Sequence, residues 1–219
     1  MSAEALLAWA RGPAFEVALV IFIAGMLLRL FEILSLGYKT DLSEARGSGV
    51  QGGLRTLFSR SLPRPSILAK EPLRIINSFV MHIGLLAMIF LFGPHVAVFE
   101  SLLGFGWPNL PSGVIDALSA MTLITLVVAL MLRLNNPVLR FLSTPGDYWA
   151  WLVTLLPVLT GYLAYNHLLL PYTLMLALHI LSVELLLISA PFSKLTHMFS
   201  FALSRWYQGY KAGHRGIES

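Results

Sequence analysis

Cysteine is absent from this 219-residue chain, and charged residues make up only 12% of it. The absence of cysteine excludes disulfides, thiolate-bound zinc and cysteine-ligated iron–sulfur clusters. Six histidines are then the strong ligands left for a soft metal, alongside eight methionines. The share of charge is about half that of an ordinary soluble domain, and 57% of the residues are hydrophobic. Together these values indicate that the chain folds in a lipid bilayer.

Five apolar runs have the length of a membrane-spanning helix, which needs about 20 residues. They lie at residues 15–36, 75–95, 114–134, 148–165 and 172–190. The first run lacks a basic start and is too long for the core of a signal peptide, so we expect it to be a retained helix. The sequence therefore predicts an all-α bundle of five transmembrane helices that forms one domain over residues 1–219.

Basic residues predict how the bundle is oriented. If there are five spans, almost all of the lysine and arginine residues fall on one side of the membrane, and the opposite side has only Arg11. This asymmetry places the N-terminus outside and the C-terminus in the cytoplasm, and it argues against nucleic acid as the partner of the positive charge. The residues on the cytoplasmic side are Lys39, Arg46, Arg55, Arg60, Arg64, Lys70, Arg74, Arg133, Arg140, Lys194, Arg205, Lys211 and Arg215.

Two polar stretches on this cytoplasmic side stand out, a loop at residues 38–71 and a tail at 198–219. Four glycines and two prolines within the loop argue against one continuous helix. The loop is either a basic segment that lies on the lipid surface or a docking surface for a cytoplasmic partner. The outer connection, residues 100–112, is rich in glycine and proline, and its Trp107 is expected to anchor it at the interface.

Histidines in or near the spans are the main candidates for chemistry, because ionisable residues within a membrane are costly. His179 and His197 are eighteen residues apart, which is five whole helical turns if the helix is continuous. They would then share a face and be separated by about 27 Å, too far to bind one metal ion. His82 and His95 of the second span supply partners in antiparallel order. Two bis-histidine sites stacked across the membrane follow, and haem iron accepts such axial pairs.

The position of His95 needs a change in helix direction. It follows His82 by thirteen residues, about 140° away from the same helical face. Gly93 and Pro94 can break or re-aim the helix at this point. His167, at the outer end of the fourth span, is the alternative fourth ligand. For both His167 and the tail residue His214, an interfacial or solvated position is the favoured interpretation.

Several stretches resemble the respiratory nitrate reductase gamma subunit, a membrane dihaem cytochrome b. Residues 77–84, Asn-Ser-Phe-Val-Met-His-Ile-Gly, resemble its second helix. Leu-His-Ile at 178–180 followed by Pro-Phe-Ser-Lys-Leu-Thr-His-Met at 191–198 resembles its fifth helix, including the eighteen-residue histidine spacing. Pro-Gly-Asp-Tyr at 145–148 resembles the start of its fourth helix, and Arg29 with the preceding apolar run resembles the end of its first.

The resemblance implies two haem b groups and a set of ligands. His82 and His197 would bind the inner haem, and His179 would bind the outer haem. The fourth family histidine follows the first by ten residues, and the nearest residue here is His95, three residues further on. The family has a lysine near the outer start of its third helix, beside the quinol site, where this chain has Ile115 and Asp116. Related membrane subunits serve heterodisulfide-reductase-like and sulfite-reductase-linked complexes.

Further polar residues are candidates for supporting roles. Asp116, near the outer end of its span, could take up quinol protons. Glu184 could relay protons or face a quinone, or could instead only hydrogen-bond a neighbouring helix through Ser119 or Thr122. Gly84 would leave space for the macrocycle beside His82. Three basic residues near the inner haem level could pair with haem propionates, or could extend to lipid phosphates instead; these are Arg29, Arg140 and Lys194.

The function expected from the sequence is that of an electron-transfer subunit in a bacterial or archaeal cytoplasmic membrane. It would connect the quinone pool with a cytoplasmic iron–sulfur partner and would not act on the terminal substrate itself. The direction of electron flow, the quinone type and the identity of the partner stay open. The alternatives are the membrane cytochrome of a heterodisulfide-reductase-like or sulfur-metabolism complex, and a haem-free scaffold or transporter whose histidines serve helix packing or proton relay.

Overall fold

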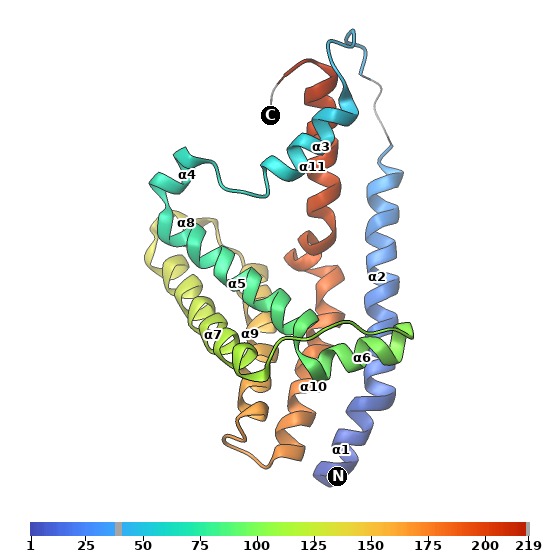
Figure 1. Cartoon of the computed structure of the whole chain (residues 1–219), viewed down its shortest axis with the longest axis vertical. Helices are drawn as coiled ribbons and strands as arrows, with labels where there is room; N and C mark the ends of the chain where they lie inside the picture. The colour runs from blue at the N-terminus through green and yellow to red at the C-terminus, as the bar shows by residue number, and fades with distance from the viewer. Residues whose placement is uncertain (38–40, 218–219) are drawn as a thin grey trace. The chain divides into compact units, whose positions relative to one another are not determined.

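The computed structural model describes residues 1–37 and 41–217, and every regular element in this part of the chain is helical (Figure 1). The first residues of the predicted loop, including Tyr38 and Lys39, and the last two of the tail lie outside the described residues. The helices are α1 (Ala3–Trp9), α2 (Phe15–Ser35), α3 (Gly49–Ser59), α4 (Pro65–Lys70), α5 (Pro72–Leu91), α6 (Gly93–Leu103), α7 (Ser112–Asn135), α8 (Pro137–Leu142), α9 (Pro145–Tyr165), α10 (Tyr172–Ser189) and α11 (His197–His214).

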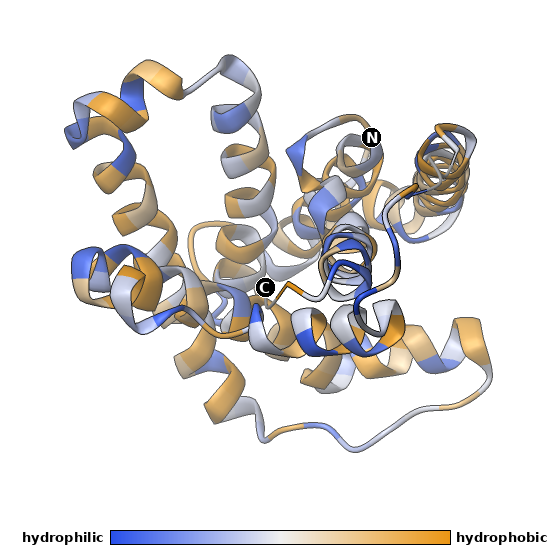
Figure 2. Ribbon diagram, turned by 90° about the horizontal axis from the view of Figure 1, so that it is seen from above, coloured by the Kyte–Doolittle hydropathy of each residue, from blue (hydrophilic) through white to orange (hydrophobic). Residues whose placement is uncertain are grey.

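Five of these helical segments are long and apolar enough to cross a membrane, which confirms the number predicted from hydropathy. They are Ala3–Ser35, Pro72–Leu91, Ser112–Asn135, Pro145–Tyr165 and Tyr172–Phe192. Hydrophobic residues predominate along them, as the orange colour of much of the ribbon in Figure 2 indicates, and many of their side chains are exposed. Exposed apolar surface on this scale is suited to contact with lipid. The chain is therefore a multi-pass membrane protein.

Proline and glycine mark where the helices start and change direction. The first span contains a π-helical segment over Ala10–Ala14 in which Gly12 has non-helical backbone angles next to Pro13. The second span ends at Leu91, and Phe92 takes an extended conformation before α6 starts with Gly93 and Pro94. The sequence predicted that the second span ends at His95. In the structure His95 lies instead in the first turn of a separate helix, α6.

The chain divides into two compact units. The first consists of Met1–Ile21 with Leu73–Ser189, and the second of Phe22–Pro72 with Ala190–Ser219. In the first unit α9 packs against both α10 and α7, and α1 packs against α10. Hydrogen bonds join the spans across the apolar interior: Asn77 Nδ2 donates to the Thr125 carbonyl at 3.0 Å, and Trp151 Nε1 donates to the Leu126 carbonyl at 2.9 Å.

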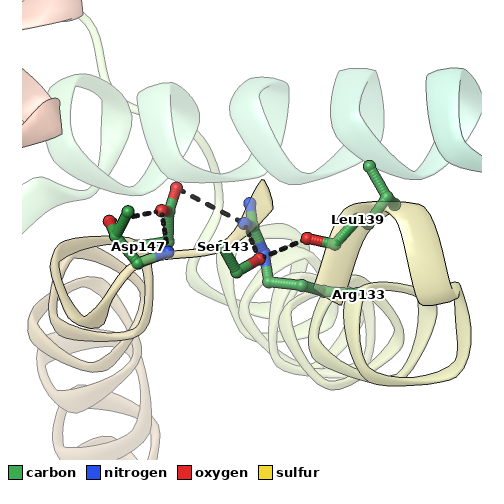
Figure 3. Close-up of polar contacts among 5 residues, drawn as sticks. Arg133, Leu139, Ser143 and Asp147 are labelled. Carbon is green, nitrogen blue, oxygen red and sulfur yellow. Dashed lines mark hydrogen bonds and ion pairs between the residues drawn. The ribbon is translucent and has the colours of Figure 1, made fainter. Parts of the chain in front are cut away.

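A polar junction holds the short connection from α7 through α8 to α9 in the first unit (Figure 3). Arg133 Nη1 donates to Ser143 Oγ at 2.8 Å and lies 3.3 Å from Asp147 Oδ1. Asp147 also accepts the backbone N–H of Thr144 at 2.9 Å, which forms a capping box at the start of α9. The Pro-Gly-Asp-Tyr segment is thus a helix start fixed by its aspartate.

In the second unit α3 packs along α11, a helix pair that the sequence did not predict for the polar loop and the tail. Glycines allow the close approach: a Cβ at Gly213 would lie 2.5 Å from the Ser48 carbonyl, and one at Gly209 would meet the side chain of Thr56. Small residues four apart on both helices let two backbones touch in this way. The glycines that argued against one continuous helix are therefore the contact surface of a helix pair.

Candidate functional site

Two of the predicted ligands, His95 and His179, lie side by side in the first unit. Their ring centroids are 6.1 Å apart and the ring planes differ by 15°. His95 is on the first turn of α6 and His179 is in the middle of α10. The turn at Phe92 gives His95 a direction that it could not have as a continuation of α5. The expected change of helix direction before His95 is therefore confirmed.

A backbone carbonyl fixes the orientation of each of these two rings. Nδ1 of His95 lies 2.7 Å from the Met88 carbonyl, and Nδ1 of His179 lies 3.1 Å from the Pro157 carbonyl. A carbonyl oxygen can only accept, so Nδ1 carries the proton and Nε2 has the lone pair. Burial lowers the pKa of His95 and so favours its neutral form. Metal-bound histidines are held by the same kind of hydrogen bond.

The walls around the pair are tight and partly aromatic. Phe92 meets the His95 ring edge-on, with centroids 5.2 Å apart, and meets the Tyr165 ring at 5.8 Å. Gly161 of α9 faces His179 so closely that a Cβ there would lie 2.9 Å from its Cε1. Thr160 Oγ1 is 3.4 Å from His179 Nδ1. The His179 ring therefore has little freedom to move toward α9.

Two neutral imidazoles with oriented Nδ1–H groups are donors of the kind that haem iron accepts as an axial pair, and here their ring centroids are 6.1 Å apart. In chemical type these two residues fit the group. Among the described residues no group of three or more histidine, aspartate or glutamate side chains could hold a metal ion by itself.

The other predicted ligands, His82 and His197, carry the same orienting hydrogen bond. Nδ1 of His82 lies 2.7 Å from the Ser78 carbonyl on α5, and Nδ1 of His197 lies 2.8 Å from the Lys194 carbonyl at the start of α11. His82 belongs to the first unit and His197 to the second. Their pairing at an inner haem therefore stays a prediction.

The remaining histidines have other surroundings. His167 is exposed in the turn after α9, with a positive φ of 53° and its ring 5.0 Å from that of Tyr172. His214 at the end of α11 has Nε2 3.2 Å from the Ser43 carbonyl. The histidine ring that lies against His179 is that of His95, which favours His95 over His167 as the fourth ligand.

The two candidate carboxylates differ in their surroundings. Asp116 on α7 accepts a hydrogen bond of 2.8 Å from Asn166 Nδ2 at the end of α9. Glu184 on α10 is only 5% exposed, and its Oε1 has no hydrogen-bond partner among the described residues. The hydroxyls that could have satisfied Glu184, those of Ser119 and Thr122, donate to backbone carbonyls of their own helix.

The residues expected near the macrocycle and its propionates have other contacts. The space beside Gly84, where we expected the macrocycle, is filled by Thr122, whose Oγ1 lies where a Cβ would be. Arg29 binds the Pro191 carbonyl and Glu32. Lys194 opens a short 3₁₀ turn and its carbonyl holds His197, while Arg140 is exposed on α8.

An open pocket of about 450 Å³ lies on the opposite side of α6 from His95. Gly93, Val96, Ala97 and Glu100 line it from α6, at the spacing of one helical face, whereas His95 lies about half a turn away. Trp107 closes the other side, and its indole N–H donates to the Phe90 carbonyl.

Sequence reasoning missed Gly161, Thr160, Phe92 and Asn166 as parts of the site. A glycine inside the apolar fourth span was a weak signal for close approach of another group. The other three had no distinguishing spacing. Thr160 and Asn166 face the site through the packing of α9 against α10 and α7, and Phe92 meets His95 at the turn before α6.

Helices of this length and apolarity, with a histidine pair held between α6 and α10, define the chain as an all-helical multi-pass membrane protein. Comparison with known proteins adds a family. The chain is 33% identical over 208 residues to a protein of Nitratidesulfovibrio vulgaris (strain Hildenborough), and the match covers 92% of this chain and 91% of that protein. The chain belongs to the same family as that protein. Neither a protein-family model nor a solved structure matches it.

Proposed function

We propose that this protein is a haem b-containing membrane subunit that transfers electrons between the quinone pool and a cytoplasmic iron–sulfur partner. The observation that carries the proposal is the His95–His179 pair, whose rings lie 6.1 Å apart with both Nδ1 atoms held by carbonyls. With both Nδ1–H groups held by carbonyls, the Nε2 lone pairs are the ones that a metal ion would use. Bound haem supplies one-electron transfer.

Each histidine has a defined task in this proposal. His95 and His179 hold the outer haem, and His82 and His197 hold the inner one. The carbonyls of Met88 and Pro157 select the tautomer of the outer pair and limit rotation of its rings. The resemblance to the nitrate reductase gamma subunit in the second and fifth helices supports His82, His179 and His197, whereas His95 lies three residues beyond the position of the family's fourth histidine.

Asp116 is the residue proposed to take up quinol protons on the outer side. Asn166 orients its carboxylate through one oxygen, which leaves the second oxygen for a substrate hydroxyl. Glu184 is proposed as a proton relay deeper in the bundle, because its Oε1 has no partner among the described residues. Oxidation of one quinol to quinone releases two protons and two electrons. Asp116 would take up the protons one at a time and pass each to water, and the bound haem would supply the acceptor for the electrons, one at a time.

The partner is proposed to bind the basic cytoplasmic segments that contain α3 and α11.

Haem content decides the central claim, that the protein is a haem b-containing subunit. Protein purified after haem-replete expression is expected to show a b-type band in a reduced-minus-oxidised spectrum and two haems per chain. His95→Ala and His179→Ala should each remove one haem, whereas His167→Ala should remove none. The absence of any b-type band would refute the proposal.

The proposed orientation has its own test, which the lack of cysteine makes simple. Single cysteines can be placed in the outer connection, as Ser112→Cys, and in the cytoplasmic loop, as Ser61→Cys. A membrane-impermeant maleimide added to intact cells should label the first and spare the second. The reverse pattern would place the N-terminus inside and overturn the assignment of the docking surface.

A further inference from the structure

A break in the helical hydrogen bonding precedes His197 in the second unit. The helix α10 ends at Ser189, and two 3₁₀ turns, Ala190–Phe192 and Lys194–Thr196, precede α11. The continuous helix that would place His179 and His197 on one face is therefore not formed. In a continuous helix the N–H of Leu195 would donate to the Pro191 carbonyl. Here Leu195 donates to Ser193 Oγ at 3.3 Å, so the Pro191 carbonyl needs another donor.

Arg29 of α2 is that donor. Its Nε lies 2.8 Å from the Pro191 carbonyl oxygen. Its Nη1 lies 2.7 Å from Glu32 Oε2, three residues further along α2, so the guanidinium is held from both sides. A charged donor to a carbonyl within an apolar region makes a stronger bond than a neutral one. This contact explains why an arginine is retained inside an apolar span.

Gly25 provides the second contact with the same proline. It lies four residues before Arg29 and therefore on the same face of α2. A Cβ at Gly25 would lie 2.6 Å from Pro191 Cβ and 2.7 Å from Pro191 Cγ, closer than real atoms approach. The bare backbone of α2 thus receives the proline ring, while Arg29 binds the proline carbonyl. Together they fix the position of Pro191 against α2.

The fixed segment leads directly to a predicted ligand. Lys194, three residues after Pro191, supplies the carbonyl that holds His197 Nδ1 at 2.8 Å. We propose that Arg29, with Gly25, is a positioning residue for His197. It anchors the break between α10 and α11 to α2, and this anchor sets the position of His197, the first residue of α11. The proposal rests on the proposed function for the role of His197, and it replaces the pairing of Arg29 with a propionate.

Backbone hydrogen exchange tests the anchor without haem. In haem-free full-length protein, Arg29→Gln should speed amide exchange in residues 190–197 about tenfold, since one charge-assisted hydrogen bond is lost. Gly25→Ala should act on the same amides by displacing the proline. Glu32→Gln is the matched control, because it retains the Nε bond to Pro191, and Arg29→Lys should restore part of the protection.

Spectroscopy of the haem-loaded protein tests the consequence for His197. Arg29→Gln and Gly25→Ala should shift the midpoint potential and the electron paramagnetic resonance signal of one haem, and leave the other unchanged. The altered signal should be the one that His197→Ala abolishes.

If haem is present and Arg29→Gln changes neither exchange nor that signal, the positioning role is wrong. If Arg29→Gln alters haem affinity with unchanged exchange in the haem-free protein, a direct propionate contact replaces it. If the protein binds no haem, the proposed function fails while the exchange result still decides the anchor.

Discussion

On the proposed function, substitution of Gly161 by alanine is expected to disturb the outer haem and leave the inner haem intact. Gly161 lies on α9 where the His179 ring of α10 comes closest. A Cβ there would lie 2.9 Å from His179 Cε1 and 3.1 Å from its Nδ1. Unstrained carbon contacts are about 3.5–4.0 Å, so the ring or the helix must shift by about 0.6 Å or more. Ligand constellations tolerate about 0.5 Å of displacement.

The shift also threatens the hydrogen bond that orients the ring. His179 Nδ1 lies 3.1 Å from the Pro157 carbonyl, close to the upper limit for such a bond. A displacement of the expected size breaks it, and a buried donor without a partner costs about 1–3 kcal/mol. The methyl group of the new alanine would occupy space that the His179 ring now fills. We therefore expect weaker outer haem binding and a changed ligand field at the haem that remains.

Two measurements check this prediction: haem per chain, and redox titration with electron paramagnetic resonance of both haems. The Gly161→Ala protein should contain between one and two haems per chain, with a shifted signal only for the haem that His179→Ala removes. Gly113→Ala is the matched control, since a Cβ at that position of α7 would meet nothing within 4 Å. A Gly161→Ala protein with the haem content, potentials and spectra of the wild type would refute the reasoning.

Three further predictions concern stability and packing. Asp147→Asn weakens the capping box with Thr144, and should lower the free energy of unfolding by about 0.5–2 kcal/mol, seen as a lower Tm in detergent. Gly213→Leu should separate α3 from α11, because a Cβ already meets the facing helix; protease cleavage between residues 60 and 64 should then become faster at unchanged haem content. The hydrogen bond from Arg215 holds the pKa of Asp41 well below its ordinary value. The contact between Arg215 and Asp41 therefore stabilises the fold fully at pH values above the ordinary aspartate pKa, and it is lost only as the pH falls through the lowered pKa of Asp41. Proteolysis at the C-terminal end should be constant from neutral pH to about pH 5. Asp41→Asn should accelerate this proteolysis at neutral pH.

Local composition was sufficient to predict the membrane spans. A span depends on about 20 consecutive apolar residues, and this information is contiguous in the sequence. The break before His95 was predicted for the same reason, since Gly93 and Pro94 disfavour a continuous helix whatever surrounds them. The helix pair α3–α11 was missed, because glycines that oppose a helix in isolation also allow two helices to touch, and only the partner helix decides between these effects.

The candidate site shows what required the tertiary structure. The sequence identified His95 and His179 as candidate ligands by type and depth, but their 6.1 Å separation depends on how α6 turns and where α10 packs. The continuous helix that would put His179 and His197 on one face does not form, because α10 ends at Ser189 and Leu195 donates its N–H to Ser193 Oγ instead of to Pro191.

The sequence by itself determined that this protein lies in a lipid bilayer, how many spans it has, and which residue types are available for a cofactor. The tertiary structure decided which of those residues meet: His95 with His179, Thr122 with Gly84, and Arg29 with Pro191. The physical reason is range. Hydropathy and helix breaking act over a few neighbouring residues, whereas a hydrogen bond to a carbonyl 162 residues away depends on the packing of helices that are distant in sequence.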